Sequence, residues 1–206
     1  MLIRAAGRHA LLLELADLAE AQRWYAGLLA RRSAGDLPAS VELVPGARTV
    51  LLDGLDDPGP ARTSLPGWEP AADAPTVEGR AVEVPVTYDG PDLAEVASRW
   101  DMALDDAVAL HTGTPFTVAF CGFSPGFAYL AGLPEHLAVP RRATPRTRVP
   151  AGSVALAGAW CGVYPQESPG GWALVGHTDL PLFDLDRDPP ALLRPGTRVR
   201  FVEARS

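Results

Sequence analysis

Apolar residues change their spacing along the first third of the chain, and the change predicts a strand followed by a helix. Ala10–Leu15 is a short apolar run bounded by polar residues, as in a strand. Asp17 is suited to cap a helix that continues to about Arg32, because Ala and Leu dominate that stretch. We therefore expect a helix packed on a small sheet.

A predicted hairpin follows this helix. The strand-like runs Val41–Val44 and Thr49–Leu52 flank the turn dipeptide Pro45-Gly46. From Asp53 to Pro75 the prolines exclude a long helix, so we expect a loop or one short helical turn. Val82–Val86 then resumes strand alternation. The pattern is typical of a βαβββ or βαββαβ sandwich whose second helix is eroded.

The second part of the chain has a different pattern. Pro91-Asp92-Leu93 opens a predicted helix that runs through Trp100, and Leu104–Leu110 predicts another that ends by Gly113. Short strands separated by Gly and Pro turns continue to the end, as in an all-β barrel or sandwich. We predict an α+β protein with a boundary near residue 87, giving domains 1–87 and 88–206.

The composition excludes several classes of protein. All 18 basic residues are Arg, so a P-loop, a protein-kinase strand lysine and a Schiff-base lysine are absent from this chain. The net charge of −7 argues against a nucleic-acid partner. The longest uncharged apolar run, Val154–Val163, is too short to span a membrane. Because Ala10–Leu13 is also too short for a secretory signal, we expect a cytoplasmic protein.

The cysteines and histidines do not predict a metal site. Cys121 and Cys161 lie in apolar or small-residue surroundings, which favours buried, reduced thiols over a disulfide. His111, His136 and His177 lack the spacing of metal ligands. We therefore expect no metal site formed by this chain.

Gly122-Phe123-Ser124-Pro125-Gly126 matches the G-x-S-x-G pattern of a hydrolase nucleophile elbow. In that elbow the residue after the serine donates its N–H to the oxyanion, and Pro125 has no N–H. We therefore interpret the segment as a tight turn. The aromatic residues Phe123, Phe127 and Tyr129 are candidates to line an apolar pocket, although core packing is the commoner role.

Residues 140–148 carry four arginines and no acid in a chain of net charge −7. The guanidinium groups suit bidentate binding of a carboxylate or phosphate, and neighbouring prolines would restrict their motion. Pairing with acidic residues elsewhere in the chain, or a solvated surface, is an equally good interpretation. The four residues are Arg141, Arg142, Arg146 and Arg148.

The segment from Tyr164 to Trp172 contains the pair Gly170-Gly171, which lets a backbone approach a ligand closely. An anion-binding loop and a plain hairpin connection both remain open. His177 ends the strand that follows, where a structural role competes with general acid–base chemistry.

An ordered series of blocks resembles one family across nearly the whole chain, most strongly from residue 82 onward. This is the family of the 5-oxoprolinase B subunit, also called allophanate hydrolase subunit 1 or the sporulation-kinase inhibitor family. The matching blocks are Gly122–Leu130, Gly132–Pro134, Pro140–Arg142, Pro145-Arg146, Val149–Val154, Tyr164-Pro165, Ser168–Trp172 and Pro195-Gly196.

The resemblance implies a small α+β N-terminal domain followed by a cyclophilin-like β-barrel. It implies a hydrolase component that acts with a homologous C subunit and with the A subunit in the ATP-dependent opening of 5-oxoproline to glutamate. The complex, rather than this chain alone, would bind ATP and Mg. Alternative roles in the family are inhibition of a sensor histidine kinase and a carboxyltransferase component of the urea carboxylase type.

The chain departs from the family pattern at two positions. His177 stands where the pattern has Arg, and Arg8 stands where it has Asp. We nevertheless expect a cleft for a small carboxylate, with Tyr164 and His177 as catalytic hydrogen-bond or proton-transfer groups. The expected substrate-binding residues are Phe123, Phe127, Arg141, Arg146, Ser168, Gly170, Gly171 and Trp172.

Overall fold

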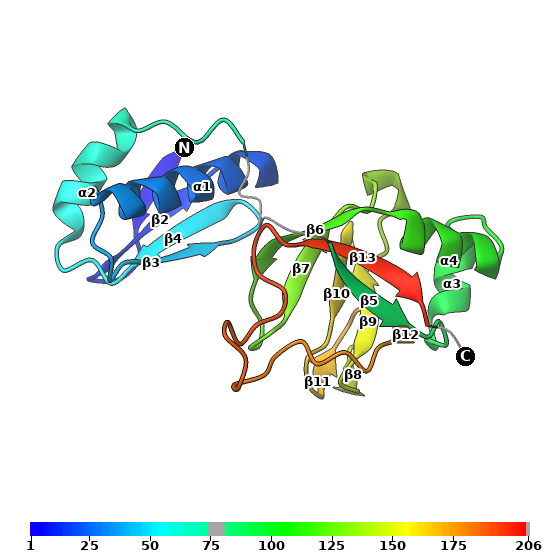
Figure 1. Ribbon diagram of the computed structural model, residues 1–206. Helices are drawn as coiled ribbons and strands as arrows, with labels where there is room; N and C mark the ends of the chain where they lie inside the picture. Colours follow the sequence, from blue (N-terminus) through cyan, green and yellow to red (C-terminus); the bar gives the residue numbers. More distant parts are fainter. Residues whose placement is uncertain (74–80, 205–206) are drawn as a thin grey trace. The chain divides into compact units, whose positions relative to one another are not determined.

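The computed structural model describes residues 1–73 and 81–204. The chain divides into two compact units, Met1–Thr76 and Val77–Ser206 (Figure 1). Each unit has its own hydrophobic core, so each is described by itself. No helix in the described ranges is long and apolar enough to cross a membrane.

The first unit is an antiparallel sheet of four strands in the order β1-β2-β4-β3. The inward side chains of β2 and β4 alternate with outward ones, and they form the core with the helix α1. The strands are β1 (Leu2–Ala5), β2 (Ala10–Glu14), β3 (Glu42–Pro45) and β4 (Thr49–Asp53). The sequence missed β1, which is short and mostly exposed.

Helix α1 (Leu18–Ala34) packs on one face of this sheet (Figure 1). The Asp17 carboxylate accepts a hydrogen bond of 2.8 Å from the Glu20 N–H, which confirms the predicted cap. The segment expected to be a loop or one short helical turn contains α2 (Pro58–Ser64) and the 3₁₀ turn η1 (Leu65–Gly67), which is more helix than expected. A helix can begin at Pro58 because the first helical turn needs no N–H donor.

The second unit is a sheet of seven strands that nearly closes into a barrel, in the order β12-β9-β10-β7-β6-β13-β5. Paired backbone hydrogen bonds of 2.9 Å between Thr87 and His177 connect its two outer strands. A separate two-stranded ribbon joins β8 to β11. The strands are β5 (Val82–Val86), β6 (Phe116–Cys121), β7 (Ala128–Ala131), β8 (Arg146–Val149), β9 (Ser153–Ala157), β10 (Trp160–Val163), β11 (Ser168–Gly170), β12 (Ala173–His177) and β13 (Arg198–Glu203).

The predicted boundary near residue 87 assigned the strand Val82–Val86 to the first domain. The structure instead pairs β5 in parallel with β13, whose residues are more than a hundred positions later in the chain. Strand alternation identifies the strand but not its distant partner, so the sequence assigned β5 to the wrong sheet.

Helices α3 (Leu93–Arg99) and α4 (Leu104–Gly113) pack beside β12 and β13 (Figure 1). His111 is a buried residue of α4, with its ring nitrogens 2.7 Å from the Tyr88 hydroxyl oxygen and 3.4 Å from Cys161 Sγ. Burial lowers the pKa of His111 to about 3 and raises the pKa of Cys161. Cys161 is buried and Cys121 half-buried, and both are free thiols as predicted.

Candidate functional site

A cavity of about 480 Å³ opens on the barrel unit and is lined mainly by aromatic side chains. Its walls come from the β6–β7 turn, the segment before β8, the β9–β10 turn and the loop around β11. We call it the aromatic pocket. It is lined by Phe123, Phe127, Tyr129, Pro140, Arg141, Ala157, Gly158, Trp160, Tyr164, Pro169, Gly170, Gly171 and Trp172.

The aromatic side chains pack edge to face around Phe127, which is buried. Its ring centre lies 5.3 Å from that of Tyr164 and 5.5 Å from that of Trp172. Phe123, at 5.4 Å from Phe127, is 60% exposed and has a φ of +69°, a left-handed conformation that is costly for a bulky residue. The fold therefore holds an exposed aromatic ring over the pocket at the expense of backbone strain.

Tyr164 is buried at the side of the pocket beside Gly170. A Cβ atom at position 170 would clash with the Tyr164 hydroxyl, so glycine is needed for this close approach. Burial raises the pKa of Tyr164, and the Trp172 backbone and the charge of Arg141 only partly offset this effect. Tyr164 is therefore a neutral hydroxyl at neutral pH, suited to donate a hydrogen bond rather than to act as a base.

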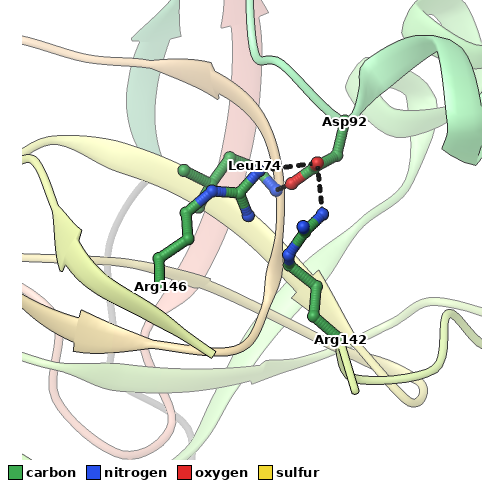
Figure 2. A network of polar contacts seen from close by, with 4 residues as sticks. All are labelled: Asp92, Arg142, Arg146 and Leu174. Atoms are coloured by element: carbon green, nitrogen blue, oxygen red, sulfur yellow. Dashed lines mark hydrogen bonds and ion pairs between the residues drawn. The ribbon is translucent and has the colours of Figure 1, made fainter. Parts of the chain in front are cut away.

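The structure separates the four clustered arginines. Arg141 lines the aromatic pocket, and it is the one arginine among the described lining residues. Arg142 and Arg146 turn instead to Asp92, whose carboxylate they reach at 3.0 Å and 2.7 Å (Figure 2). Arg148 forms an exposed ion pair with Glu167. The sequence left two interpretations open, and each applies to different residues. Arg141 is an open cation, whereas the other three arginines pair with acidic residues of the chain.

Asp92 is 5% exposed, and both of its carboxylate oxygens accept hydrogen bonds. One carboxylate oxygen accepts from Arg142 and Arg146, and the other accepts a 2.7 Å hydrogen bond from the Leu174 N–H (Figure 2). Burial alone would raise the pKa of this carboxyl group, but the hydrogen bonds from Arg146 and Leu174 and the two arginine charges lower it. Asp92 is therefore ionised in the folded protein and connects Arg142, Arg146 and the Leu174 backbone.

The predicted site residues are only partly brought together. Phe123, Phe127, Tyr164, Arg141, Gly170, Gly171 and Trp172 share the aromatic pocket. Ser168 begins β11 outside the lining residues, where its hydroxyl lies 3.5 Å from the Gln166 carbonyl oxygen. Arg146 and His177 instead line a second cavity of about 410 Å³, where His177 Nδ1 lies 2.8 Å from an Asp89 carboxylate oxygen.

The G-x-S-x-G segment is a turn between β6 and β7, as predicted. The N–H of Phe127 donates to the Ser124 carbonyl at 3.0 Å, and strand β7 rather than a helix follows. The Ser124 hydroxyl is buried without a hydrogen-bond partner among the described residues. No histidine that could activate it lines the aromatic pocket.

The described residues do not form a site for magnesium and a nucleotide. In residues 1–73 and 81–204, no three His, Cys, Asp or Glu side chains gather closely enough to hold a metal ion. Arg142 and Arg146, which would suit phosphate, are already bound to Asp92. A triphosphate would find a single arginine, Arg141, in the aromatic pocket. We therefore derive no step through ATP on this chain.

Sequence reasoning missed Trp160 in the pocket and the role of Asp92. Asp92 was interpreted as part of a helix start, which its position before α3 supports. However, its side chain makes no capping hydrogen bond to α3. The local excess of arginine allowed pairing with an acid elsewhere in the chain as one interpretation, but it did not indicate which acid.

Comparison with known proteins agrees with this architecture. The family model for the carboxyltransferase domain, subdomain C and D, matches residues 1–193. The 5-oxoprolinase B subunit of Escherichia coli O157:H7 is 48% identical over 173 residues, which cover 81% of this chain and 79% of that protein.

Solved structures share the fold. The crystal structure of TTHA0988 matches with a TM-score of 0.80 and 38% identity, covering 100% of this chain. This chain spans only 41% of that one. The Kluyveromyces lactis urea carboxylase structure matches with a TM-score of 0.69 at 19% identity, over 98% of this chain and 22% of that one, which is a likeness of fold. The chain therefore belongs to the carboxyltransferase subdomain C and D family, and within it to the group of 5-oxoprolinase B subunits.

Proposed function

We propose that this chain acts as the B subunit of an ATP-dependent, cytoplasmic 5-oxoprolinase, which opens 5-oxoproline to glutamate with the help of the A and C subunits. The name of the Escherichia coli relative supports the reaction and the existence of partner subunits. The cyclophilin-like type of barrel belongs to the same proposal, supported by the nearly closed seven-stranded sheet.

The chemistry of the aromatic pocket supports a small cyclic carboxylate as substrate. Phe127 and Trp172 offer apolar faces to a five-membered ring. Arg141 offers a guanidinium group to a carboxylate, which it can bind by two parallel hydrogen bonds. One arginine at the mouth of an aromatic cavity of about 480 Å³ is the observation that carries the proposal.

Tyr164 supplies a further interaction in this scheme. Opening the ring adds one water across the amide. Negative charge develops on the carbonyl oxygen as the water oxygen bonds to the amide carbon, and the C–N bond then breaks as a proton passes to the nitrogen. The neutral Tyr164 hydroxyl is suited to donate a hydrogen bond to that oxygen. ATP supplies phosphoryl-transfer chemistry when it binds to the complex, and the partner subunits provide that site. His177, in the second cavity, has no step in this scheme.

The test is reconstitution with the A and C subunits, followed by an assay for ATP-dependent glutamate release from 5-oxoproline. We expect release with the native chain and a large loss with Arg141→Gln. Arg148→Gln is the matched control, because Arg148 pairs with Glu167 outside the aromatic pocket. A complex that assembles but releases no glutamate would contradict the proposal and direct attention to allophanate or to kinase inhibition.

A further inference from the structure

Asp92 connects the first turn of α3 to elements that surround the aromatic pocket. Its backbone N–H donates to the Leu174 carbonyl at 3.0 Å, and its carboxylate accepts from the Leu174 N–H at 2.7 Å. The same carboxylate binds Arg142 and Arg146 (Figure 2). One buried side chain thus joins β12 to both ends of the segment that leads into β8.

That segment carries the pocket's cation. Arg141 directly precedes Arg142, so the ion pair of Arg142 with Asp92 restrains the backbone on which Arg141 is mounted. The Arg142 N–H also donates to the Gly171 carbonyl at 2.8 Å. This hydrogen bond links the backbone beside Arg141 to the adjacent Gly170-Gly171 loop of the pocket.

Arg146 lies beside the Gly170-Gly171 loop of the pocket. It begins β8 and pairs in the ribbon with Gly170, the residue that lies against Tyr164. Its charge also reaches the Tyr164 hydroxyl, whose pKa it helps to lower against the effect of burial. The two arginines held by Asp92 therefore adjoin the two groups that would contact a substrate, Arg141 and Tyr164.

Side-chain capping of α3 does not account for the location of Asp92. Asp92 occupies the N-cap position of α3, but its carboxylate makes no hydrogen bond to the start of the helix. A buried carboxylate is costly unless it is paired and fully hydrogen-bonded, as this one is. The groups that bind this carboxylate do not themselves line the aromatic pocket, and Arg146 and Leu174 line the second cavity. Arg142 and Arg146 contact the pocket's Gly170-Gly171 loop through backbone pairing.

We propose that Asp92 is a positioning residue, which sets the geometry of Arg141 and the Gly170-Gly171 loop for substrate binding without touching the substrate. This inference rests on the proposed function of the aromatic pocket. It predicts that loss of the Asp92 charge weakens substrate binding more than it slows the chemical step.

The test compares Asp92→Asn with Glu95→Gln in the complex reconstituted with the A and C subunits. Glu95 is an exposed acid one turn further along α3, so the control makes the same chemical change on the same helix. We expect Asp92→Asn to raise the KM for 5-oxoproline about tenfold with kcat within about twofold. Glu95→Gln should match the native chain.

A double-mutant cycle distinguishes positioning from a general loss of folding. If Asp92 acts through Arg146, adding Arg146→Gln to Asp92→Asn should raise KM little beyond the larger single effect. Additive effects on KM would contradict the proposal, as would an unchanged KM in folded Asp92→Asn. If circular dichroism shows that Asp92→Asn is unfolded, Arg142→Gln carries the test, with a raised KM expected and an unchanged KM contradicting it. Absence of glutamate release by the native complex would instead refute the proposed function.

Discussion

Arg141 and Arg146 are five residues apart in one basic segment, yet they occupy opposite environments. Arg141 is exposed and lines an open aromatic pocket. Arg146 is largely covered, and its guanidinium group is bound to a buried carboxylate that lies 54 positions earlier in the chain. Arg141 is therefore suited to bind a ligand, whereas Arg146 is suited to stabilise the fold.

The difference shows that a cluster of like charges is not a single site. The role of each arginine in residues 140–148 is set by its partner: Asp92 for two of them and Glu167 for a third. Removing an arginine bound to Asp92 leaves a buried carboxylate with only one arginine, whereas removing Arg141 leaves no buried charge with fewer partners. Substitution of the open Arg141 should therefore affect substrate binding alone, whereas substitution of an arginine bound to Asp92 should also lower stability.

The largest expected effect is on stability when the buried pair is broken. Arg146→Gln leaves Asp92 with one arginine, and it should lower the free energy of unfolding of the barrel unit by about 2–4 kcal/mol. Arg141→Gln should change it by less than about 0.5 kcal/mol. Urea denaturation followed by tryptophan fluorescence measures both values. An equal loss in the free energy of unfolding for the two variants would contradict the different structural roles assigned to Arg141 and Arg146.

Gly170→Ala tests how tightly the Gly170-Gly171 loop fits the pocket. The added Cβ meets the hydroxyl of buried Tyr164, so we expect a loss of about 1–3 kcal/mol in the free energy of unfolding. Gly113→Ala is a matched control in the same unit, because a Cβ there meets nothing within 4 Å and its φ is not positive. Similar denaturation midpoints for the two variants would show that Tyr164 and the Gly170-Gly171 loop can move to accommodate the added methyl group.

Asp92 should also give the barrel unit a specific sensitivity to acid. Its pKa is lowered in the folded protein, so its contribution to stability is present above the unfolded value near 4 and is lost as pH falls through the folded pKa. The stability gap between the native chain and Asp92→Asn should therefore narrow below about pH 4. Urea denaturation at a series of pH values measures this gap.

His111 adds a second acid effect that both of these proteins share. Its pKa is lowered to about 3 by burial, so it remains neutral in the fold while the unfolded chain binds a proton below about pH 6.5. This destabilisation cancels in the difference between the native chain and Asp92→Asn. A gap that stays constant down to pH 3 would show that Asp92 is not stabilised as an anion.

The smallest expected effect is that of Arg148→Gln. Both Arg148 and Glu167 are more than half exposed, so their ion pair should contribute less than about 0.5 kcal/mol. A loss comparable to that of Arg146→Gln would show that exposure does not decide which arginines are structural.

The sequence was sufficient for features that depend on neighbouring residues. The Asp17 cap, the hairpin around Pro45-Gly46 and the turn at Pro125 were all predicted from local chemistry. The aromatic pocket was predicted in outline from Phe123 and Phe127, together with the Gly170-containing loop.

Features that depend on distant partners could not be predicted in this way. The parallel pairing of β5 with β13 and the pairing of Asp92 with Arg146 both join segments separated by fifty residues or more. The position of His177 in a cavity apart from Tyr164 depends likewise on how the barrel closes. Residue types and spacing carry no information on these distances.

The most direct test of the central contrast is steady-state kinetics of the reconstituted complex with Arg141→Gln, set beside Arg148→Gln. We predict that Arg141→Gln raises the KM for 5-oxoproline at least about tenfold while its denaturation midpoint stays at the native value. Arg148→Gln should keep both native values. A native KM in folded Arg141→Gln would contradict the assignment of the open arginine to substrate binding.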